Sequence, residues 1–192
     1  LENSVSGNLE WTIEQFADVR NARLTLPTKF DMVDPLLELR HGHNVTIRVS
    51  LNPDEIIRRV EFGTSRLDAR IAALNKLYHA GYDVGILIAP IIMIEGWQEM
   101  YERLFQKMAE SIDPAILRGV QLEIIYMTYG MVTEKINQEA FPGAITLHDR
   151  ESMAFCGRSR YGYTQPVKAE ASAFLRERIA HWLPEANIAY IV

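Results

Sequence analysis

Short segments of alternating or wholly apolar residues recur along the chain and predict β-strands. Residues 44–50 alternate, with apolar side chains on one face and Thr46, Arg48 and Ser50 on the other. Further strands are predicted over residues 23–29, 84–89 and 120–127, with a closing strand or tail over 187–192. The two later internal segments are almost wholly apolar, which is typical of buried strands.

Between these strands, apolar residues recur at the three- and four-residue spacing of amphipathic helices. The clearest case is 66–80, where Ser65 is the expected N-cap and Gly81 the expected end. Asn52 is the expected N-cap of the helix before it. Helices are also predicted over residues 10–20, 31–40, 53–60, 98–111, 132–140 and 168–183.

Strands that alternate with helices predict an α/β fold with a parallel sheet. A doubly wound sheet buries both faces of its strands, whereas 23–29 and 44–50 carry polar residues on one face. The pattern therefore favours closure into a (β/α) barrel with a polar interior. In such folds the functional residues lie at the carboxyl ends of the strands.

Residues 141–167 differ from the rest, because they are rich in Gly, Ser, Tyr and Arg and predict a loop or hairpin. We therefore divide the chain in two. Residues 1–140 are expected to form part of the barrel, and 141–192 a hairpin with a closing helix and strand.

Composition narrows the possible function. The 192 residues carry a net charge of −5, so only a local basic patch could bind nucleic acid. One cysteine, Cys156, excludes an internal disulfide framework or a complete cysteine-ligated metal cluster within these residues, and it fits the reducing cytoplasm. No run approaches 18 apolar residues, so no membrane partner is expected.

Two residues at strand ends could bind a small molecule. The Lys29 ammonium is a compact charge for a carboxylate or phosphate, although it could also form a Schiff base or simply face solvent. The Ser50 hydroxyl could hydrogen-bond the same ligand, or it could bond its own backbone in a turn.

Basic and aromatic residues mix near the C-terminus, around Arg160 and Tyr161. Arginine suits phosphate, and an aromatic ring suits a base that has left its stack. The alternative is an ordinary solvated hairpin of mixed charge.

Motifs spread over nearly the whole chain, from about residue 10, point to one family. They are Thr28-Lys29-Phe30, Val33-Asp34, Arg40-His41, Phe62-Gly63-Thr64-Ser65, Asp68-Ala69-Arg70, Ala80-Gly81-Tyr82, Ala89-Pro90-Ile91, Glu95-Gly96-Trp97 and Arg160-Tyr161-Gly162. In this combination and spacing the chain resembles the C-terminal portion of the spore photoproduct lyase family.

The resemblance implies a radical S-adenosyl-L-methionine enzyme on a partial (β/α)6 TIM-like barrel with a C-terminal hairpin and helix. Residues 1–140 would be the C-terminal part of that barrel, and the hairpin within 141–192 would contact the substrate. The family returns the 5-thyminyl-5,6-dihydrothymine lesion of ultraviolet-damaged DNA to two thymines. A 4Fe-4S cluster on three cysteines cleaves S-adenosylmethionine, and the radical so formed takes hydrogen from the lesion. An electron donor such as ferredoxin or flavodoxin and a cytoplasmic location are implied as well.

The resemblance also implies roles for four residues: Lys29 and Ser50 contact S-adenosylmethionine, and Arg160 and Tyr161 contact the substrate. The cluster motif and the hydrogen-donating cysteine belong upstream, so no catalytic residue is expected here and Cys156 is a bystander. The expected partner is the missing N-terminal half of the same protein. The chain alone is expected to be inactive.

One segment departs from the family, because Thr128-Tyr129-Gly130-Met131 stands where a more basic stretch is expected. Three alternatives therefore stay open. They are a divergent radical enzyme with another substrate, another barrel enzyme that uses Lys29 as a Schiff-base or anion-binding residue, and a non-catalytic nucleic-acid module built on 150–168.

Overall fold

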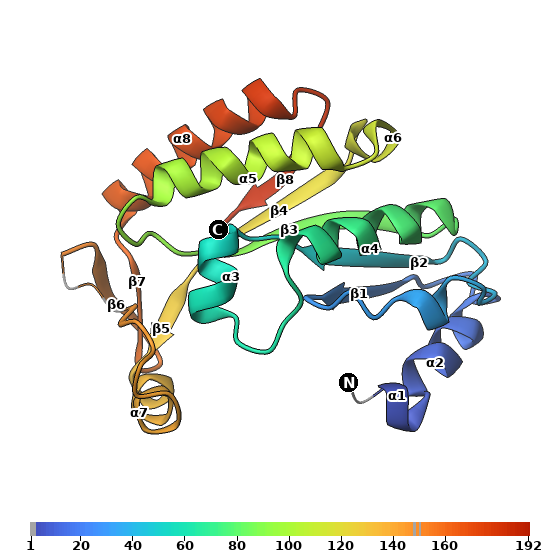
Figure 1. Ribbon diagram of the computed structural model, residues 1–192, viewed down its shortest axis with the longest axis horizontal. Coiled ribbons are helices and arrows are strands. Elements are labelled where there is room, and N and C mark those ends of the chain that lie inside the picture. The colour runs from blue at the N-terminus through green and yellow to red at the C-terminus, as the bar shows by residue number, and fades with distance from the viewer. Residues whose placement is uncertain (1–2, 148, 150) are drawn as a thin grey trace.

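The structure is a computed structural model that describes residues 3–147, 149 and 151–192. Its main feature is a five-stranded parallel sheet (Figure 1). In spatial order the strands are β1 (Leu24–Thr28), β2 (Val45–Ser50), β3 (Asp83–Ile91), β4 (Gln121–Tyr126) and β8 (Asn187–Ile191). Every strand predicted from the sequence is present.

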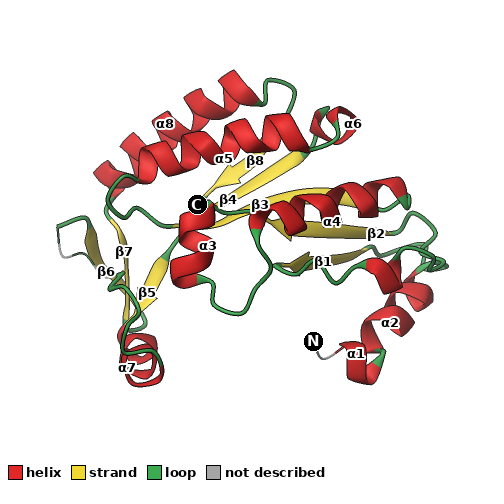
Figure 2. Ribbon diagram, viewed as in Figure 1, coloured by secondary structure: helices red, strands yellow, loops and turns green. Residues whose placement is uncertain are grey.

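Helices precede and connect these strands. They are α1 (Asn3–Ser6), α2 (Asn8–Phe16), α3 (Asp54–Val60), α4 (Leu67–His79), α5 (Trp97–Ser111), α6 (Pro114–Leu117), α7 (Met131–Ala140) and α8 (Gln165–Trp182). Helices α4, α5 and α8 lie side by side on one face of the sheet (Figure 2). The strands follow one another across the sheet in chain order, which is not the order of a doubly wound sheet. The α/β prediction is confirmed, and closure into a (β/α)6 barrel stays a prediction.

The two faces of β2 explain this layering. Val45, Ile47 and Val49 are at most 2% exposed and belong to the core beneath the helices. On the other face Arg48 reaches across the sheet to Glu123 of β4, with 2.8 Å between Nη1 and Oε2. The alternation read from the sequence thus separates an apolar helix-covered face from a polar one.

The helix predicted over 31–40 is wrong, because only a single 3-10 turn, η1 (Asp34–Leu36), forms there. Its backbone bonds span three residues, as from Leu39 N–H to the Leu36 carbonyl. The hydroxyl of Tyr82 also donates to that carbonyl at 2.6 Å. This one turn buries Leu36 and gives its carbonyl two donors, Leu39 N–H and the Tyr82 hydroxyl.

Two predicted N-caps are also wrong. Helices α3 and α4 begin after Pro53 and Arg66, and neither has a side-chain cap. Asn52 and Ser65 instead make tertiary contacts, with Glu61 and Asp31 respectively. The predicted end of α4 is correct, because Gly81 follows it with a positive φ of 87°.

The hairpin prediction for 141–167 is confirmed by strands β6 (Met153–Gly157) and β7 (Arg160–Tyr163). A third strand, β5 (Thr128–Gly130), pairs with β7, giving a small antiparallel sheet in the order β5-β7-β6. Strand β8 lies beyond residue 140 yet pairs with β4 in the main sheet. The division at residue 140 stays a prediction.

No described helix is both long and apolar enough to cross a membrane.

Candidate functional site

Three neighbouring strands bring the first candidate residues together. Lys29 follows β1, Ser50 ends β2, and the Ala89 carbonyl belongs to β3. Lys29 Nζ donates to Ser50 Oγ at 3.1 Å and to the Ala89 carbonyl at 2.9 Å. Ser50 Oγ donates to the same carbonyl at 3.1 Å. Carboxyl ends of parallel strands share one edge, so residues 21 apart in sequence become partners.

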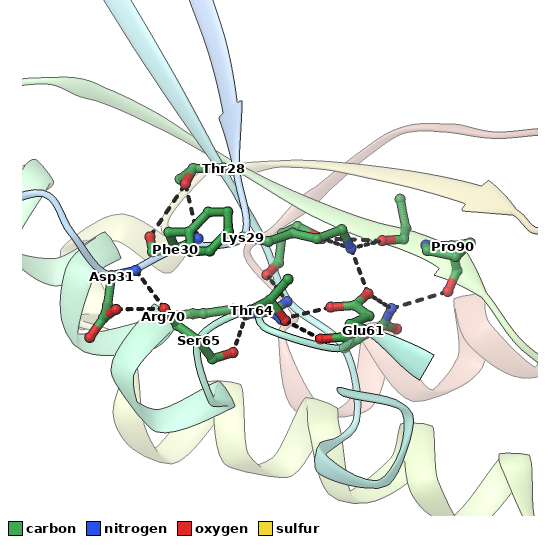
Figure 3. A network of polar contacts seen from close by, with 12 residues as sticks. Thr28, Lys29, Phe30, Asp31, Glu61, Thr64, Ser65, Arg70 and Pro90 are labelled. Atoms are coloured by element: carbon green, nitrogen blue, oxygen red, sulfur yellow. Dashed lines mark hydrogen bonds and ion pairs between the residues drawn. The ribbon is translucent and has the colours of Figure 1, made fainter. Parts of the chain in front are cut away.

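Sequence reasoning assigned no role to Glu61, which completes the contacts of Lys29 (Figure 3). Its Oε1 accepts from Lys29 Nζ at 2.5 Å and from Asn52 Nδ2 at 2.9 Å. Its Oε2 accepts from Arg70 Nη2 at 2.7 Å. Glu61 is 8% exposed, so this carboxylate is a buried acceptor shared by two cations.

Arg70 was missed as well, although it is fully buried. Besides Glu61, its guanidinium donates to the carbonyls of Ser65 at 2.7 Å and Ser50 at 2.9 Å and to Thr64 Oγ1 at 2.6 Å. A signal was present in the sequence, because Arg70 stands among Leu67, Ile71 and Leu74 on the apolar face of its helix. A charged residue on such a face needs a buried partner.

The charges do not balance at this strand edge. Burial lowers the pKa of Lys29 below its usual value, and Arg70 acts in the same direction against the attraction of Glu61. Burial alone would raise the pKa of Glu61, but Lys29, Asn52 and Arg70 together outweigh it and hold that pKa below its usual value. Two cations therefore share one carboxylate, which leaves about one excess positive charge for an anionic ligand.

A cavity of about 490 Å³ opens beside Lys29. Its walls come from three regions, the strand edge at Lys29 and Pro90, the end of α3 with the α3–α4 connection, and the segment that includes α7. They are Lys29, Arg59, Val60, Glu61, Phe62, Thr64, Pro90, Tyr129, Glu134, Asn137, Gln138, Phe141, Pro142, Ala144, Ile145, Thr146 and Leu147. The volume and the mixed lining suit a small organic molecule with one charged end.

The second candidate pair lies in the three-stranded sheet. Arg160 and Tyr161 are neighbours on β7, so their side chains point to opposite faces. Arg160 is exposed and Tyr161 is partly buried. Tyr163 ties this strand to the main sheet, because its hydroxyl accepts the Met93 N–H, two residues after β3, at 2.8 Å.

Cys156 is exposed, and its thiol donates to the Arg160 carbonyl with 3.4 Å between Sγ and O. Within the described part of the chain, no group of three His, Cys, Asp or Glu residues could hold a metal ion. A single cysteine does not fit a cluster that needs three thiolates.

Comparisons with known proteins agree on one family. The spore photoproduct lyase family model matches residues 2–192. Spore photoproduct lyase of Bacillus subtilis (strain 168) is 31% identical over 186 residues, which are 95% of this chain and 54% of that protein. The protein of the same name from Geobacillus sp. (strain Y412MC61) is 29% identical over 187 residues, 95% of this chain and 55% of that protein.

Solved structures give the same answer. Spore photoproduct lyase complexed with dinucleoside spore photoproduct matches with a TM-score of 0.90 and 28% identity, over 99% of this chain and 57% of that chain. A double mutant with bound AdoMet and dinucleoside spore photoproduct matches equally well. The chain spans about half the length of the relatives that it matches.

Proposed function

The chain belongs to the spore photoproduct lyase family, and from this we propose that it is part of a DNA repair lyase that returns 5-thyminyl-5,6-dihydrothymine to two thymines. The observation that carries the proposal is the cluster of Lys29, Ser50, Glu61 and Arg70 at the carboxyl edge of the parallel sheet. The five strands would form part of a (β/α)6 barrel, with the polar face of the sheet turned inward.

We propose that Lys29 and Ser50 hold the methionyl carboxylate of S-adenosyl-L-methionine. The excess positive charge at this edge favours such a group, and Nζ and Oγ, 3.1 Å apart, can both donate to one carboxylate. A related structure contains AdoMet. When bound and reduced, S-adenosylmethionine would supply the radical chemistry. This chain's residues would bind its polar end and orient it.

The 4Fe-4S cluster does not fit this chain, which contains one cysteine. We therefore propose that the cluster ligands and the hydrogen-donating cysteine come from the N-terminal half of the same protein. A ferredoxin or flavodoxin would deliver electrons there, in the cytoplasm. Without that half the chain would bind ligands but would not repair DNA.

We further propose that Arg160 and Tyr161 contact damaged DNA from the two faces of β7. The exposed Arg160 guanidinium suits a phosphate, whereas the Tyr161 ring suits a base. A related structure holds a dinucleoside spore photoproduct, which supports a thymine dimer as ligand.

Isothermal titration calorimetry, with S-adenosylmethionine added to the chain, tests the cofactor site. Lys29→Ala and Ser50→Ala should each weaken binding, and the methyl ester of S-adenosylmethionine should bind the wild type as weakly as the free acid binds Lys29→Ala. Lys107→Ala is the matched control, because Lys107 is an exposed lysine paired with Asp68 on the helical surface. Equal affinity for acid and ester would overturn the carboxylate assignment.

One observation favours a second candidate, a carbonyl-binding enzyme with Lys29 as a Schiff base. Burial lowers the pKa of Lys29, which makes the neutral nucleophilic amine more accessible. The contact with Glu61 opposes this, because a carboxylate at 2.5 Å stabilises the ammonium. Borohydride reduction with a small aldehyde, followed by peptide mass analysis, separates the two. A stable adduct on Lys29 would favour the second candidate.

A further inference from the structure

Asn52, two residues after β2, is a fully buried polar residue whose amide is bonded at both ends. Its Nδ2 donates to Glu61 Oε1 at 2.9 Å and to the Pro90 carbonyl at 3.2 Å. Its Oδ1 accepts from the Tyr101 hydroxyl at 3.3 Å. A buried amide with both N–H groups and its oxygen paired cannot rotate without leaving polar atoms unsatisfied. The side chain of Asn52 is therefore held in one orientation.

The chemistry of its neighbours determines that orientation. A carboxylate and a carbonyl can only accept, so the NH₂ group of Asn52 must face Glu61 and Pro90. On the other side, burial raises the pKa of the Tyr101 hydroxyl, which keeps its proton and can donate it to Oδ1. Tyr101 is itself fixed, because its fully buried hydroxyl accepts the Ile92 N–H at 3.0 Å. Helix α5, which carries Tyr101, thus orients the amide of Asn52.

Asn52 connects two of the three acceptors of the Lys29 ammonium. It bonds Glu61 Oε1 directly, and this is the atom that accepts from Lys29. It also bonds the Pro90 carbonyl, one residue after the Ala89 carbonyl that accepts from Lys29 at 2.9 Å. Lys29, Glu61 and Pro90 surround this point in Figure 3. One buried amide therefore joins the end of α3 to the end of β3 around Nζ.

We infer that Asn52 is a positioning residue for Lys29, because it holds Glu61 and the end of β3 where they direct Nζ toward an anionic ligand. Asn52 is outside the cavity lining, so it acts through these neighbours and not by touching the ligand. A small misplacement of a binding group costs much of its interaction. The inference rests on the proposed function in one respect, since it takes the methionyl carboxylate of S-adenosylmethionine as that ligand.

The test compares S-adenosylmethionine with its methyl ester by isothermal titration calorimetry. Asn52→Leu keeps the approximate size of the side chain and removes its donors. It should weaken binding of the free acid about 10-fold, the loss of a charge-assisted hydrogen bond, and change binding of the ester less than about twofold. A residue that only maintains the fold would weaken both ligands alike.

Asn75→Leu is the matched control. Asn75 of α4 also bonds through both ends of its amide, because Nδ2 donates to the Ser111 carbonyl at 3.0 Å and Oδ1 accepts the Asp113 N–H at 3.0 Å. These partners lie at the end of α5 and beyond it, away from Lys29. The control should lose stability and keep wild-type affinity for both ligands.

A second measurement needs no cofactor. Burial raises the pKa of Glu61, and the hydrogen bond from Asn52 is one of the contacts, after those of Lys29, that lower it. In a carboxyl-carbon NMR titration the pKa of Glu61 should therefore rise in Asn52→Leu and stay unchanged in Asn75→Leu. If Asn52→Leu does not fold, Tyr101→Phe provides the test, because it removes only the hydroxyl that orients the amide. It should weaken the acid about 2- to 10-fold and leave the ester unchanged.

Three outcomes would overturn the inference: wild-type affinity for the acid in folded Asn52→Leu, an equal loss for acid and ester, or an unchanged pKa of Glu61. A different result would remove the proposed cofactor contact instead. If the wild type binds acid and ester equally and the pKa of Glu61 still rises in Asn52→Leu, Lys29 does not bind the methionyl carboxylate. Asn52 then still positions the partner of Lys29, for another anion.

Discussion

At the carboxyl edge of the parallel sheet, Lys29 and Arg70 each donate to Glu61 and to backbone carbonyls, whereas Arg160 and Phe155 project from a short hairpin with exposed side chains. In the first region, burial of the charges costs folding free energy, and each buried charge therefore needs partners. The second depends on backbone pairing and leaves its side chains available. Substitutions in the first region should therefore change stability and binding together, and those in the second should change binding alone.

Arg70→Leu should have the largest effect. It leaves the buried Glu61 carboxylate without its Oε2 partner and the Ser50 carbonyl without a donor from this side chain. Breaking a buried ion pair on one side costs about 3–5 kcal/mol of the free energy of unfolding. Urea denaturation measures this, with Arg66→Leu on the exposed start of the same helix as control. A loss below about 1 kcal/mol would contradict the contrast between the two regions.

Acid should weaken the first region through Glu61. Its pKa lies below the usual 4.5, so between the two values the unfolded chain binds more protons than the folded one. The stability contributed by the ionised carboxylate is complete above pH 4.5 and is lost as the pH falls through the folded-state pKa. Thermal unfolding between neutral and acid pH should show this loss in the wild type. Glu61→Gln should lack that part of the pH dependence, whereas an unchanged curve would remove Glu61 as its source.

Substituting alanine for one glycine in each sheet compares how tightly the two sheets are packed. A Cβ on Gly85 of β3 would lie 3.3 Å from Cγ of Arg48, whose guanidinium is held by Glu123, so Gly85→Ala should cost about 1 kcal/mol. A Cβ on Gly162 of β7 would meet Sγ of Cys156 at 3.6 Å, an ordinary contact. Gly162→Ala should be neutral or slightly stabilising. Melting temperatures of the two variants measure this difference. A larger loss of melting temperature for Gly162→Ala than for Gly85→Ala would disprove the difference in packing.

Arg160→Ala should have the smallest effect on stability, within about 0.5 kcal/mol, because its side chain is exposed. The same variant should lose affinity for damaged DNA, most clearly at low salt. Parallel urea denaturation and anisotropy titration separate the two quantities. A large loss of stability would mean that Arg160 holds the hairpin together.

The same contrast explains what the sequence could predict. The pairing of Lys29 with Ser50 follows from where two strands end, so strand patterns and the family resemblance were enough to select both residues. The role of Glu61 depends on how the connection between α3 and α4 folds back beneath the strands, and no local pattern encodes that. Arg70 was detectable in principle, since it interrupts an apolar helix face.

Short elements were the other features that the sequence pattern did not predict. Strand β5 has three residues, too few for a periodicity to appear, and it exists because β7 pairs with it. The segment around Asp34–Leu36 has helical spacing, but only one turn forms, and its last carbonyl accepts a hydrogen bond from Tyr82, 46 residues further along the chain. Both elements make contacts distant in sequence, which local patterns do not reveal.

One consequence of the Lys29 contacts concerns selectivity. An ammonium has three N–H donors, and those of Lys29 have three acceptors: Ser50 Oγ, a Glu61 oxygen and the Ala89 carbonyl. A ligand must therefore compete with an acceptor already in place, and its net affinity is the difference between the two hydrogen bonds. Water or a neutral amide gains little from such an exchange, whereas an anion gains a charge-assisted bond. The Ser50 hydroxyl and the Ala89 carbonyl thus compete with any ligand for Lys29, and this competition disfavours ligands that are weak acceptors.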